Sequence, residues 1–391
     1  MMGAATVVES IHGTEAALKA VYHNPVFIAL WAVTAVAGII YIVKMGLLRR
    51  AATFSLHIAF VIILAGALIT HYAGESGSIH LKEGEPLSEW ELDDGTVAAL
   101  PFSLTLRKFT IDYYPGSKDP RDYRSDVEVD GEPAVISMNK ILKKDGYRFF
   151  QADYDEDLSG SILAVSRDPA GVPVTYAGYL LLLLSMLAFF FEKQSGFRRA
   201  LRRLRENGRS GAMPVWVLVA LIVLAALILA YVTVFGLRGK HLLPVLRSPL
   251  LPIHVISIML SYTLLAITMG IGIASLISGK KERRRDVSLV FLYPAVFLLA
   301  FGIFAGAVWA NISWGGYWGW DPKETWALVT MLLYSAALHA GQLGGVSRRT
   351  GRPTFFRNPT FFHIYIIAAF LAVLITWFGV NYLLGGMHSY A

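Results

Sequence analysis

The stretch WGGYWGWDPKETW, Trp314–Trp326, decides the fold class through its own composition and through the two segments that flank it. It contains four tryptophans, three glycines and an Asp-Pro pair. The flanking segments, at about 287–309 and 326–343, are apolar, and each is long enough to cross a bilayer as a helix. The sequence therefore predicts a membrane protein that presents a tryptophan-rich loop at a membrane surface.

The tryptophans are concentrated in this loop rather than spread along the chain. Five of the nine lie between Trp309 and Trp326, whereas an aromatic belt at the membrane interface would occupy many helix ends. Gly315 and Gly316 separate the indoles, and glycine lets another group approach the backbone closely. This pattern favours a binding surface for a flat group over simple anchoring in the membrane.

The composition of the whole chain agrees with a membrane protein. Its 391 residues are 55% hydrophobic and only 16% charged, which lies outside the range of ordinary soluble domains. The sequence contains no cysteine, which excludes disulfides, thiolate metal sites and a cysteine nucleophile. The net charge of +7 does not indicate a nucleic-acid partner, because the basic residues gather in short connections between apolar segments.

We expect an α-helical polytopic membrane protein with about eight transmembrane helices and both termini outside. Basic residues fill alternate connections, at 44–50, 193–209, 280–285 and 348–357, and the positive-inside rule places these four in the cytoplasm. Contact with lipid headgroups is their expected role. The first 24 residues lack a basic n-region, so we expect no cleavable signal peptide. The expected spans are approximately 25–45, 53–72, 174–191, 213–236, 251–278, 287–309, 326–343 and 361–384.

The one long connection on the outer side, 73–172, carries a pattern typical of β-strands. Short alternating stretches such as Ser103–Asp112 and Val127–Asp130 are broken by Gly, Pro and Asp. About 100 residues suffice for a small antiparallel sandwich or barrel with its own core. We therefore expect a small extracytoplasmic β-rich domain.

Four of the ten histidines are placed where they could bind iron. His57 and His339 each lie about one turn from the cytoplasmic end of an expected span, and so share a depth in the membrane. His254 and His388 lie at the outer surface, on either side of the tryptophan loop in sequence. Neutral imidazole is a good axial ligand for haem iron, and two of them close a six-coordinate site. The histidines therefore predict an inner and an outer haem site.

Haem is a flat, mostly apolar disc with two carboxylates, so it needs a flat aromatic surface and a few polar or basic anchors, and we expect the tryptophan stretch to supply the surface. Trp314, Trp318 and Trp320 are the expected haem contacts, and Asp321-Pro322 is typical of a turn that begins a helix. Glu324 suits the first turn of that helix, and Trp326 could equally be packing. The basic candidates for the haem carboxylates are Arg238, Lys240 and Arg247.

Each of these residues also has an ordinary explanation. A single histidine near a span end is more often a headgroup or inter-helix hydrogen-bonding residue than a ligand, although ionisable groups inside a membrane are functional candidates. His363 competes with His339, because it too lies near the inner surface. The histidines without an assigned role are His12, His23, His71, His80, His241 and His363.

The tryptophan stretch resembles the WWD motif of haem-handling proteins in cytochrome c maturation. Its surroundings resemble the CcsA/ResC branch over about 213–391, and the N-terminal half resembles the partner protein, CcsB/ResB. The residues that carry the first resemblance are His254-Val, Ser261-Tyr262, Tyr334–His339 and Phe378–Tyr390. The second is carried by Ser55–His57, Leu64–Gly66, Tyr147–Tyr154 and Ser166–Gly171.

The chain thus resembles a natural fusion of the two halves of the system II cytochrome c synthase. The resemblance implies a ResB-like N-terminal segment with two spans at 1–72 and a ResB-like outer domain at 73–172. A third span and a basic cytoplasmic linker follow at 173–212. The ResC/CcsA-like haem-handling domain then takes 213–391, with its WWD loop at 309–326.

The resemblance also implies the activity. His57 and His339 would take haem b from the cytoplasmic side, and His254 and His388 would hold it axially at the WWD surface. There, Trp314, Trp318, Trp320 and Asp321, with Gly315 and Gly316, would present haem to the Cys-x-x-Cys-His motif of apocytochrome c. Two thioether bonds would form, which is the lyase-type activity of a holocytochrome c synthase, at the periplasmic face of the bacterial cytoplasmic membrane.

The reaction needs reduced thiols and orientation more than an acid-base pair, so a thiol-reducing partner is expected besides the client and the membrane lipids. One departure is the outer domain, which in the ResB family is usually much larger. Two alternatives stay open: a haem exporter without ligation activity, and a bis-histidine haem b electron-transfer subunit. A structural assembly subunit is a third. The WWD motif disfavours this subunit and the electron-transfer subunit, but it barely discriminates against the exporter.

Overall fold

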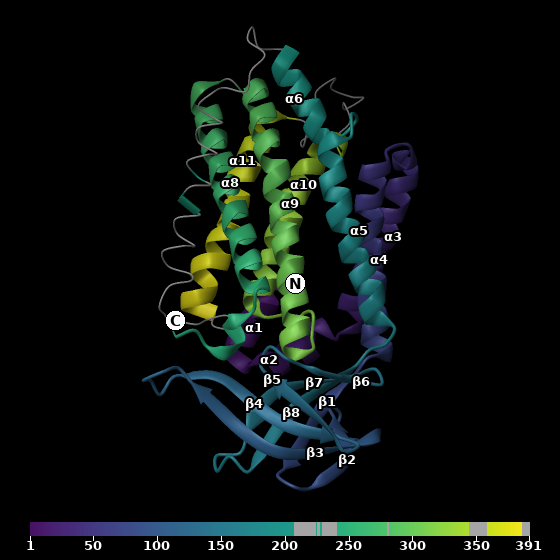
Figure 1. Ribbon diagram of the computed structural model, residues 1–391. Helices are drawn as coiled ribbons and strands as arrows, with labels where there is room; N and C mark the ends of the chain where they lie inside the picture. The colour runs from purple at the N-terminus through teal and green to yellow at the C-terminus, as the bar shows by residue number, and fades with distance from the viewer. Residues whose placement is uncertain (207–223, 225–226, 229–240, 280, 344–357, 385–391) are drawn as a thin grey trace.

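The computed structural model describes residues 1–206, 224, 227–228, 241–279, 281–343 and 358–384. Long helices form a bundle, and an antiparallel sheet covers one end of it (Figure 1). Short N-terminal helices lie between the bundle and the sheet. They are α1 (Met2–His12), α2 (Thr14–Ala17) and the π-helical turn η1 (Leu18–Tyr22).

The described part of the chain contains six helices long and apolar enough to cross a membrane, so the protein is a multi-pass membrane protein. They are α3 (Pro25–Lys44), α4 (Ala51–Ala73), α5 (Gly171–Phe191) continued by α6 (Gly196–Glu206), α8 (Leu250–Ser278), α9 (Lys281–Trp314), and α11 (Pro359–Leu374) continued by the π-helical segment η6 (Ile375–Leu384).

Two of the expected spans are not among these six. The span expected at 213–236 lies outside the described residues. The span expected at 326–343 corresponds to α10 (Pro322–Leu343), a helix in the bundle that does not reach the apolarity of the other six. Membrane helices and a β-rich domain are therefore confirmed, whereas the number of eight spans and the outer position of both termini stay predictions.

Small residues bring neighbouring helices together in the bundle. A Cβ added at Gly66 of α4 would lie 2.3 Å from Thr175 Oγ1 of α5, and one at Gly178 would lie 2.7 Å from Ile63. Such close approach is typical of membrane helices, which gain more from packing than from hydrophobic burial. The helices share one apolar core that includes Leu292 and Tyr334, both fully buried.

Eight antiparallel strands form one sheet in the order β5-β4-β3-β2-β1-β8-β7-β6. The first strand in sequence, β1, pairs with the last, β8, and Glu75 lies opposite Arg167. The chain therefore leaves the sheet beside the point where it entered. The strands are β1 (Glu75–Lys82), β2 (Pro86–Leu92), β3 (Val97–Tyr113), β4 (Pro120–Val129), β5 (Glu132–Ser137), β6 (Leu142–Lys144), β7 (Tyr147–Tyr154) and β8 (Gly160–Arg167).

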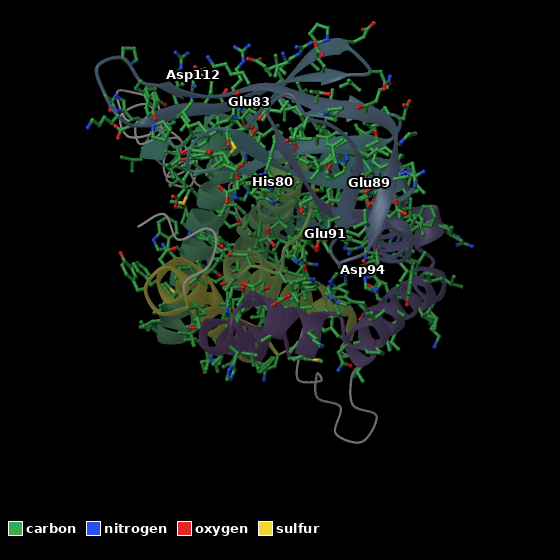
Figure 2. The ribbon with its side chains drawn as sticks, turned by 90° about the horizontal axis from the view of Figure 1, so that it is seen from below. His80, Glu83, Glu89, Glu91, Asp94 and Asp112 are labelled. Carbon is green, nitrogen blue, oxygen red and sulfur yellow. The ribbon has the colours of Figure 1, made fainter. Side chains whose placement is uncertain are left out.

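The sheet has its own hydrophobic core, separate from that of the helices. Alternate residues of β3, namely Leu100, Phe102, Leu104 and Leu106, are buried and face this core. That is the period-two pattern of a sheet with one buried face. Figure 2 views the molecule from the sheet end, and the exposed acidic side chains there include Glu83, Glu89, Glu91, Asp94 and Asp112.

The charges at the other end of the bundle have the opposite sign. The helix α6 lies at the end away from the sheet (Figure 1) and carries five arginines in the sequence GFRRALRRLRE. Arg203 of α6 pairs with Asp286 of α9 at 2.7 Å. The fold therefore separates a basic end from the end that carries the sheet.

Candidate functional site

His57 and His339 come together inside the bundle. His57 lies on α4 and His339 on α10, and their ring centroids are 5.8 Å apart with the planes at 88°. Tyr41 of α3 is 5.8 Å from each ring. The fold thus places two imidazoles and a phenol ring, contributed by three helices, at one point of the membrane region.

Hydrogen bonds set the tautomer of both imidazoles. Each Nδ1 lies 2.7 Å from the carbonyl oxygen four residues earlier, that of Thr53 for His57 and that of Ser335 for His339. A carbonyl only accepts, so Nδ1 carries the hydrogen and Nε2 carries the lone pair. A backbone carbonyl is one of the usual hydrogen-bond partners of a metal-binding histidine. The donor set therefore fits axial ligation of haem iron.

His363 is placed differently. It is fully buried on α11, and its Nε2 lies 3.0 Å from the carbonyl oxygen of Lys281 at the start of α9. Its Nδ1 has no hydrogen-bond partner among the described residues. The imidazole that meets His57 is that of His339, whereas the ring beside His363 is that of Phe362. The geometry favours a helix-joining role for His363.

His254 lies in the second turn of α8, a helix that begins at the end of the bundle near the sheet (Figure 1). Its ring lies against α9. Its Nδ1 is 2.7 Å from the carbonyl oxygen of Gly302. A Cβ added at Gly306 would lie only 2.6 Å from the same nitrogen. Gly306 thus makes room for the imidazole, and the carbonyl of Gly302, four residues earlier, orients it. The expected partner, His388, lies outside the described residues.

The tryptophan loop is not the flat aromatic surface that its composition suggests. Trp314 meets Trp309 edge to face at 70°, and Trp318 meets Trp320 at 83°. The chain turns sharply between the indoles, because Gly315 has a φ of 87° and Trp320 a φ of 58°. Trp318 packs against the apolar core of the helices. Gly316 is exposed.

The end of the loop is fixed by the start of α10. Asp321 is buried and directly precedes Pro322, and its carbonyl oxygen accepts from the Thr325 amide at 2.9 Å. The Glu324 carboxylate turns back and accepts from the amide of Gly319 at 2.9 Å. These contacts agree with the helix-start roles expected of Asp321 and Glu324.

The sheet holds the beginning of the loop. Arg148 of β7 donates to Asn311 Oδ1 at 2.8 Å and to the Gly315 carbonyl at 3.5 Å. Asn311 donates to the same carbonyl at 3.1 Å. The ring of Phe150 would lie 2.8 Å from a Cβ at Gly315. The outer domain therefore braces the tryptophan loop directly, a contact that the sequence analysis missed.

Of the three basic residues expected to bind the haem carboxylates, one contacts the outer domain and two are not described by the structure. Arg247 donates to the carbonyl of Arg121 at 3.3 Å and lies over the Tyr114 ring, both in the outer domain. Arg238 and Lys240 lie outside the described residues. The sequence analysis did not identify Gly302 and Gly306. Their spacing, G-x-x-x-G, could have indicated them, because it is typical of close contact between membrane helices.

Comparison with known families agrees with this arrangement. The sequence profile of the family described as cytochrome C assembly protein matches residues 180–388. The profile of the ResB-like family matches residues 34–163. The two matches follow one another along the chain, and together they contain both histidines of the inner pair, His254 and the tryptophan loop.

Individual relatives carry matching names. Protein NrfI of Wolinella succinogenes is 33% identical over 186 residues, which is 43% of this chain and 20% of NrfI. Cytochrome c biogenesis protein CcsA of Guillardia theta is 35% identical over 185 residues, 39% of this chain and 58% of that protein. CcsA of Picosynechococcus is 50% identical over 93 residues, 24% of each chain. The matches thus span less than two thirds of each relative.

The family profile covers more than half of the chain, and the resemblance found in the sequence is confirmed. The chain belongs to the cytochrome c assembly protein family, and the ResB-like match ahead of it is consistent with a fused CcsB-CcsA protein of system II.

Proposed function

We propose that this protein moves haem b from the cytoplasmic side of a bacterial inner membrane to its tryptophan loop on the periplasmic face. There it attaches the haem covalently to the Cys-x-x-Cys-His motif of an apocytochrome c. The observation that carries the proposal is the pair His57 and His339, whose imidazoles meet with both Nδ1 atoms bonded to backbone carbonyls. Family membership supports haem handling in general.

The proposed orientation rests on charge. Basic α6 lies at the end of the bundle away from the sheet (Figure 1), and arginine-rich connections are retained in the cytoplasm. This orientation puts the inner pair near the cytoplasm and puts His254, the tryptophan loop and both termini outside. Haem would then enter between His57 and His339 and leave at the outer end.

At the inner site, the side chains bind rather than react. The Nε2 atoms of His57 and His339 would coordinate the iron, and Tyr41 would pack against the pair. The carbonyls of Thr53 and Ser335 hold each ring in the tautomer that coordinates. Because these bonds are already made, little reorganisation is needed when haem enters.

At the outer site, His254 and His388 would bind the iron, and the tryptophan loop would orient the porphyrin. The contact of His254 with Gly302 sets the direction of its ring. In each attachment, the sulfur of a client thiol bonds to one vinyl carbon and the thiol hydrogen goes to the other. No electrons are gained or lost, so positioning is the main catalytic device.

The chain contains no cysteine, so it cannot keep the client thiols reduced by thiol exchange. A separate thiol-reducing partner is therefore part of the proposal. The absence of cysteine also means that no thiol of the synthase competes with the client for the vinyl groups.

Co-expression with a Cys-x-x-Cys-His apocytochrome, in a host without its own maturation system, tests the proposal. Haem staining on a denaturing gel should show covalent haem on the client, and His254→Ala should remove it. His80→Ala is a matched control, because His80 lies on the outer domain and pairs with Asp155. Haem that co-purifies with this chain while the client stays unstained would identify a haem exporter instead.

A further inference from the structure

The first 27 residues cover part of the tryptophan loop. Tyr22 stacks on the Trp320 indole, with centroids 4.4 Å apart and planes at 12°. Phe27 meets the same indole edge to face at 5.1 Å. Tyr22 and Phe27 are both almost fully buried. We call α1, α2, η1 and Phe27 the N-terminal clamp, because together they hold the side chain of Trp320 from outside the loop.

The clamp also grips the start of α10. The Trp326 indole donates to Thr6 Oγ1 at 3.1 Å, and the Tyr22 hydroxyl lies 3.3 Å from Thr325 Oγ1. Gly3 lies flat against Trp326, since a Cβ there would be 3.1 Å from the indole. These contacts come from α1 and from η1, near the two ends of the N-terminal segment, so both elements are docked on the start of α10.

Trp320 has a backbone conformation that needs such support. Its φ of 58° lies in the left-handed region, which bulky residues rarely adopt and which persists only where the surrounding structure imposes it. One restraint is local, because Thr325 Oγ1 donates to the Trp320 carbonyl at 3.1 Å. The others are Tyr22 and Phe27. The strained turn is thus held from both the backbone and the side chain.

The clamp lies outside both family matches. The ResB-like match begins at residue 34 and the cytochrome c assembly match at residue 180. The residues that the clamp holds, Trp320 and Trp326, lie inside the second match. A segment outside both matched ranges therefore contacts the tryptophan loop inside one of them.

We propose that the N-terminal clamp sets the orientation of Trp320 for haem, and that Tyr22 is its main positioning residue. The inference rests on the proposed haem site at the loop. Tyr22 covers one face of the indole, so a porphyrin can stack only on the other. Loss of the clamp would let the strained turn relax and would turn the indole away from the position that haem requires.

The chain has no cysteine, so a single introduced thiol can report docking of the clamp without haem. Ala17 is 1% exposed within the clamp and Ile11 is 68% exposed on α1. Maleimide should label Ala17→Cys slowly and Ile11→Cys rapidly. Adding Tyr22→Ala should raise the labelling rate of Ala17→Cys roughly five- to tenfold, as expected for loss of one aromatic pair and one hydrogen bond. Adding Tyr22→Phe should raise it less than twofold, because the ring is kept.

The haem readout uses Tyr22→Ala and Tyr22→Phe without the cysteine, with Ile11→Ala as the matched control on α1. Tyr22→Ala should change the optical spectrum of the outer haem and lower covalent haem on the client about tenfold, while haem bound by the inner pair stays. Tyr22→Phe and Ile11→Ala should behave like the unaltered protein.

Two results would overturn the proposal. In the first, Tyr22→Ala raises the labelling rate of Ala17→Cys, which shows that the clamp is released, but leaves the outer haem spectrum and the covalent haem on the client unchanged. The other is slow labelling that Tyr22→Ala does not alter, which would show that Tyr22 does not hold the segment. If the unaltered protein places no haem on the client, it is the proposed function that fails. The labelling rate of Ala17→Cys would still show whether Tyr22 holds the clamp in place.

Discussion

Arg148 of the outer domain and Asn311 at the end of α9 are joined by a hydrogen bond of 2.8 Å from Nη1 to Oδ1. The bond connects the ResB-like half to the cytochrome c assembly half, three residues before Trp314. A second bond, from Nη2 of Arg148 to Ser166 Oγ at 2.8 Å, fixes the guanidinium to the sheet. The loop therefore takes its position from both halves of the chain.

We predict that Arg148→Ala lowers covalent haem on the client about tenfold, because hydrogen bonds from a charged group contribute about 1.5–3 kcal/mol. Arg148→Lys should restore little of it, since an ammonium cannot reach Asn311 and Ser166 together as the planar fork does. Haem staining of the co-expressed client measures both variants.

The control for this prediction is Arg107→Ala. Arg107 pairs with Glu128 within the sheet and is 63% exposed, so the pair contributes little. Unimpaired staining in Arg148→Ala, or equal loss in Arg107→Ala, would show that the contact between the two halves does not position the loop.

We predict that Gly306→Ala disables the outer site almost as fully as His254→Ala. The added Cβ would lie 2.6 Å from Nδ1 and 2.8 Å from Cε1 of the His254 ring, so the ring must move away from Gly302. The optical spectrum of the haem that co-purifies should lose its outer component. Gly270→Ala on α8 is the matched control, because nothing lies within 4 Å of a Cβ there. If Gly306→Ala kept the outer component of the haem spectrum, His254 would not be a haem ligand.

We predict that docking of the N-terminal clamp weakens as the pH rises. Burial raises the pKa of Glu9 above its usual 4.5, a hydrogen bond from Thr14 lowers it in part, and the charge of Asp321 raises it. Tyr22 is the other titratable group that interacts with Glu9. Because the docked clamp binds the Glu9 proton more tightly, it is stabilised fully at pH values below 4.5, the ordinary pKa of the group. This stabilisation is lost as the pH rises through the raised pKa.

The labelling rate of Ala17→Cys, divided by that of Ile11→Cys, cancels the titration of the thiol itself. The ratio should increase with pH in the unaltered background and stay flat with Glu9→Gln, which remains neutral throughout. An equal increase in both backgrounds would assign the pH dependence to another group.

Much of the architecture could be predicted because its signals are local in the sequence. Apolar runs such as 25–45 and 251–278 predicted α3 and α8 within a few residues. The depth of His57 and His339 in their expected spans suggested that they could meet, and their rings lie 5.8 Å apart. Their role as haem ligands stays a prediction.

The parts that could not be predicted depend on contacts between distant segments. Nothing near Tyr22 indicates that it stacks on Trp320, because the packing arises only when α1, α3 and α10 are assembled. The tilt of Trp318 against Trp320 depends on the left-handed backbone of Trp320, which the residue type alone does not favour. Composition suggested a flat surface, whereas the backbone decides how the indoles face one another.

Haem entry through the proposed inner site is the step on which the rest of the proposed function depends. The haem content of purified variants tests this step most directly. We would purify His57→Ala, His339→Ala and His363→Ala and determine haem b per protein by the pyridine haemochrome method. The first two should lose most of the co-purified haem, because each removes one of the two proposed Nε2 ligands, whose rings meet in the bundle. His363→Ala should keep it, since His363 bonds the carbonyl of Lys281. Full haem in His57→Ala and His339→Ala, or loss in His363→Ala alone, would contradict haem entry through this pair.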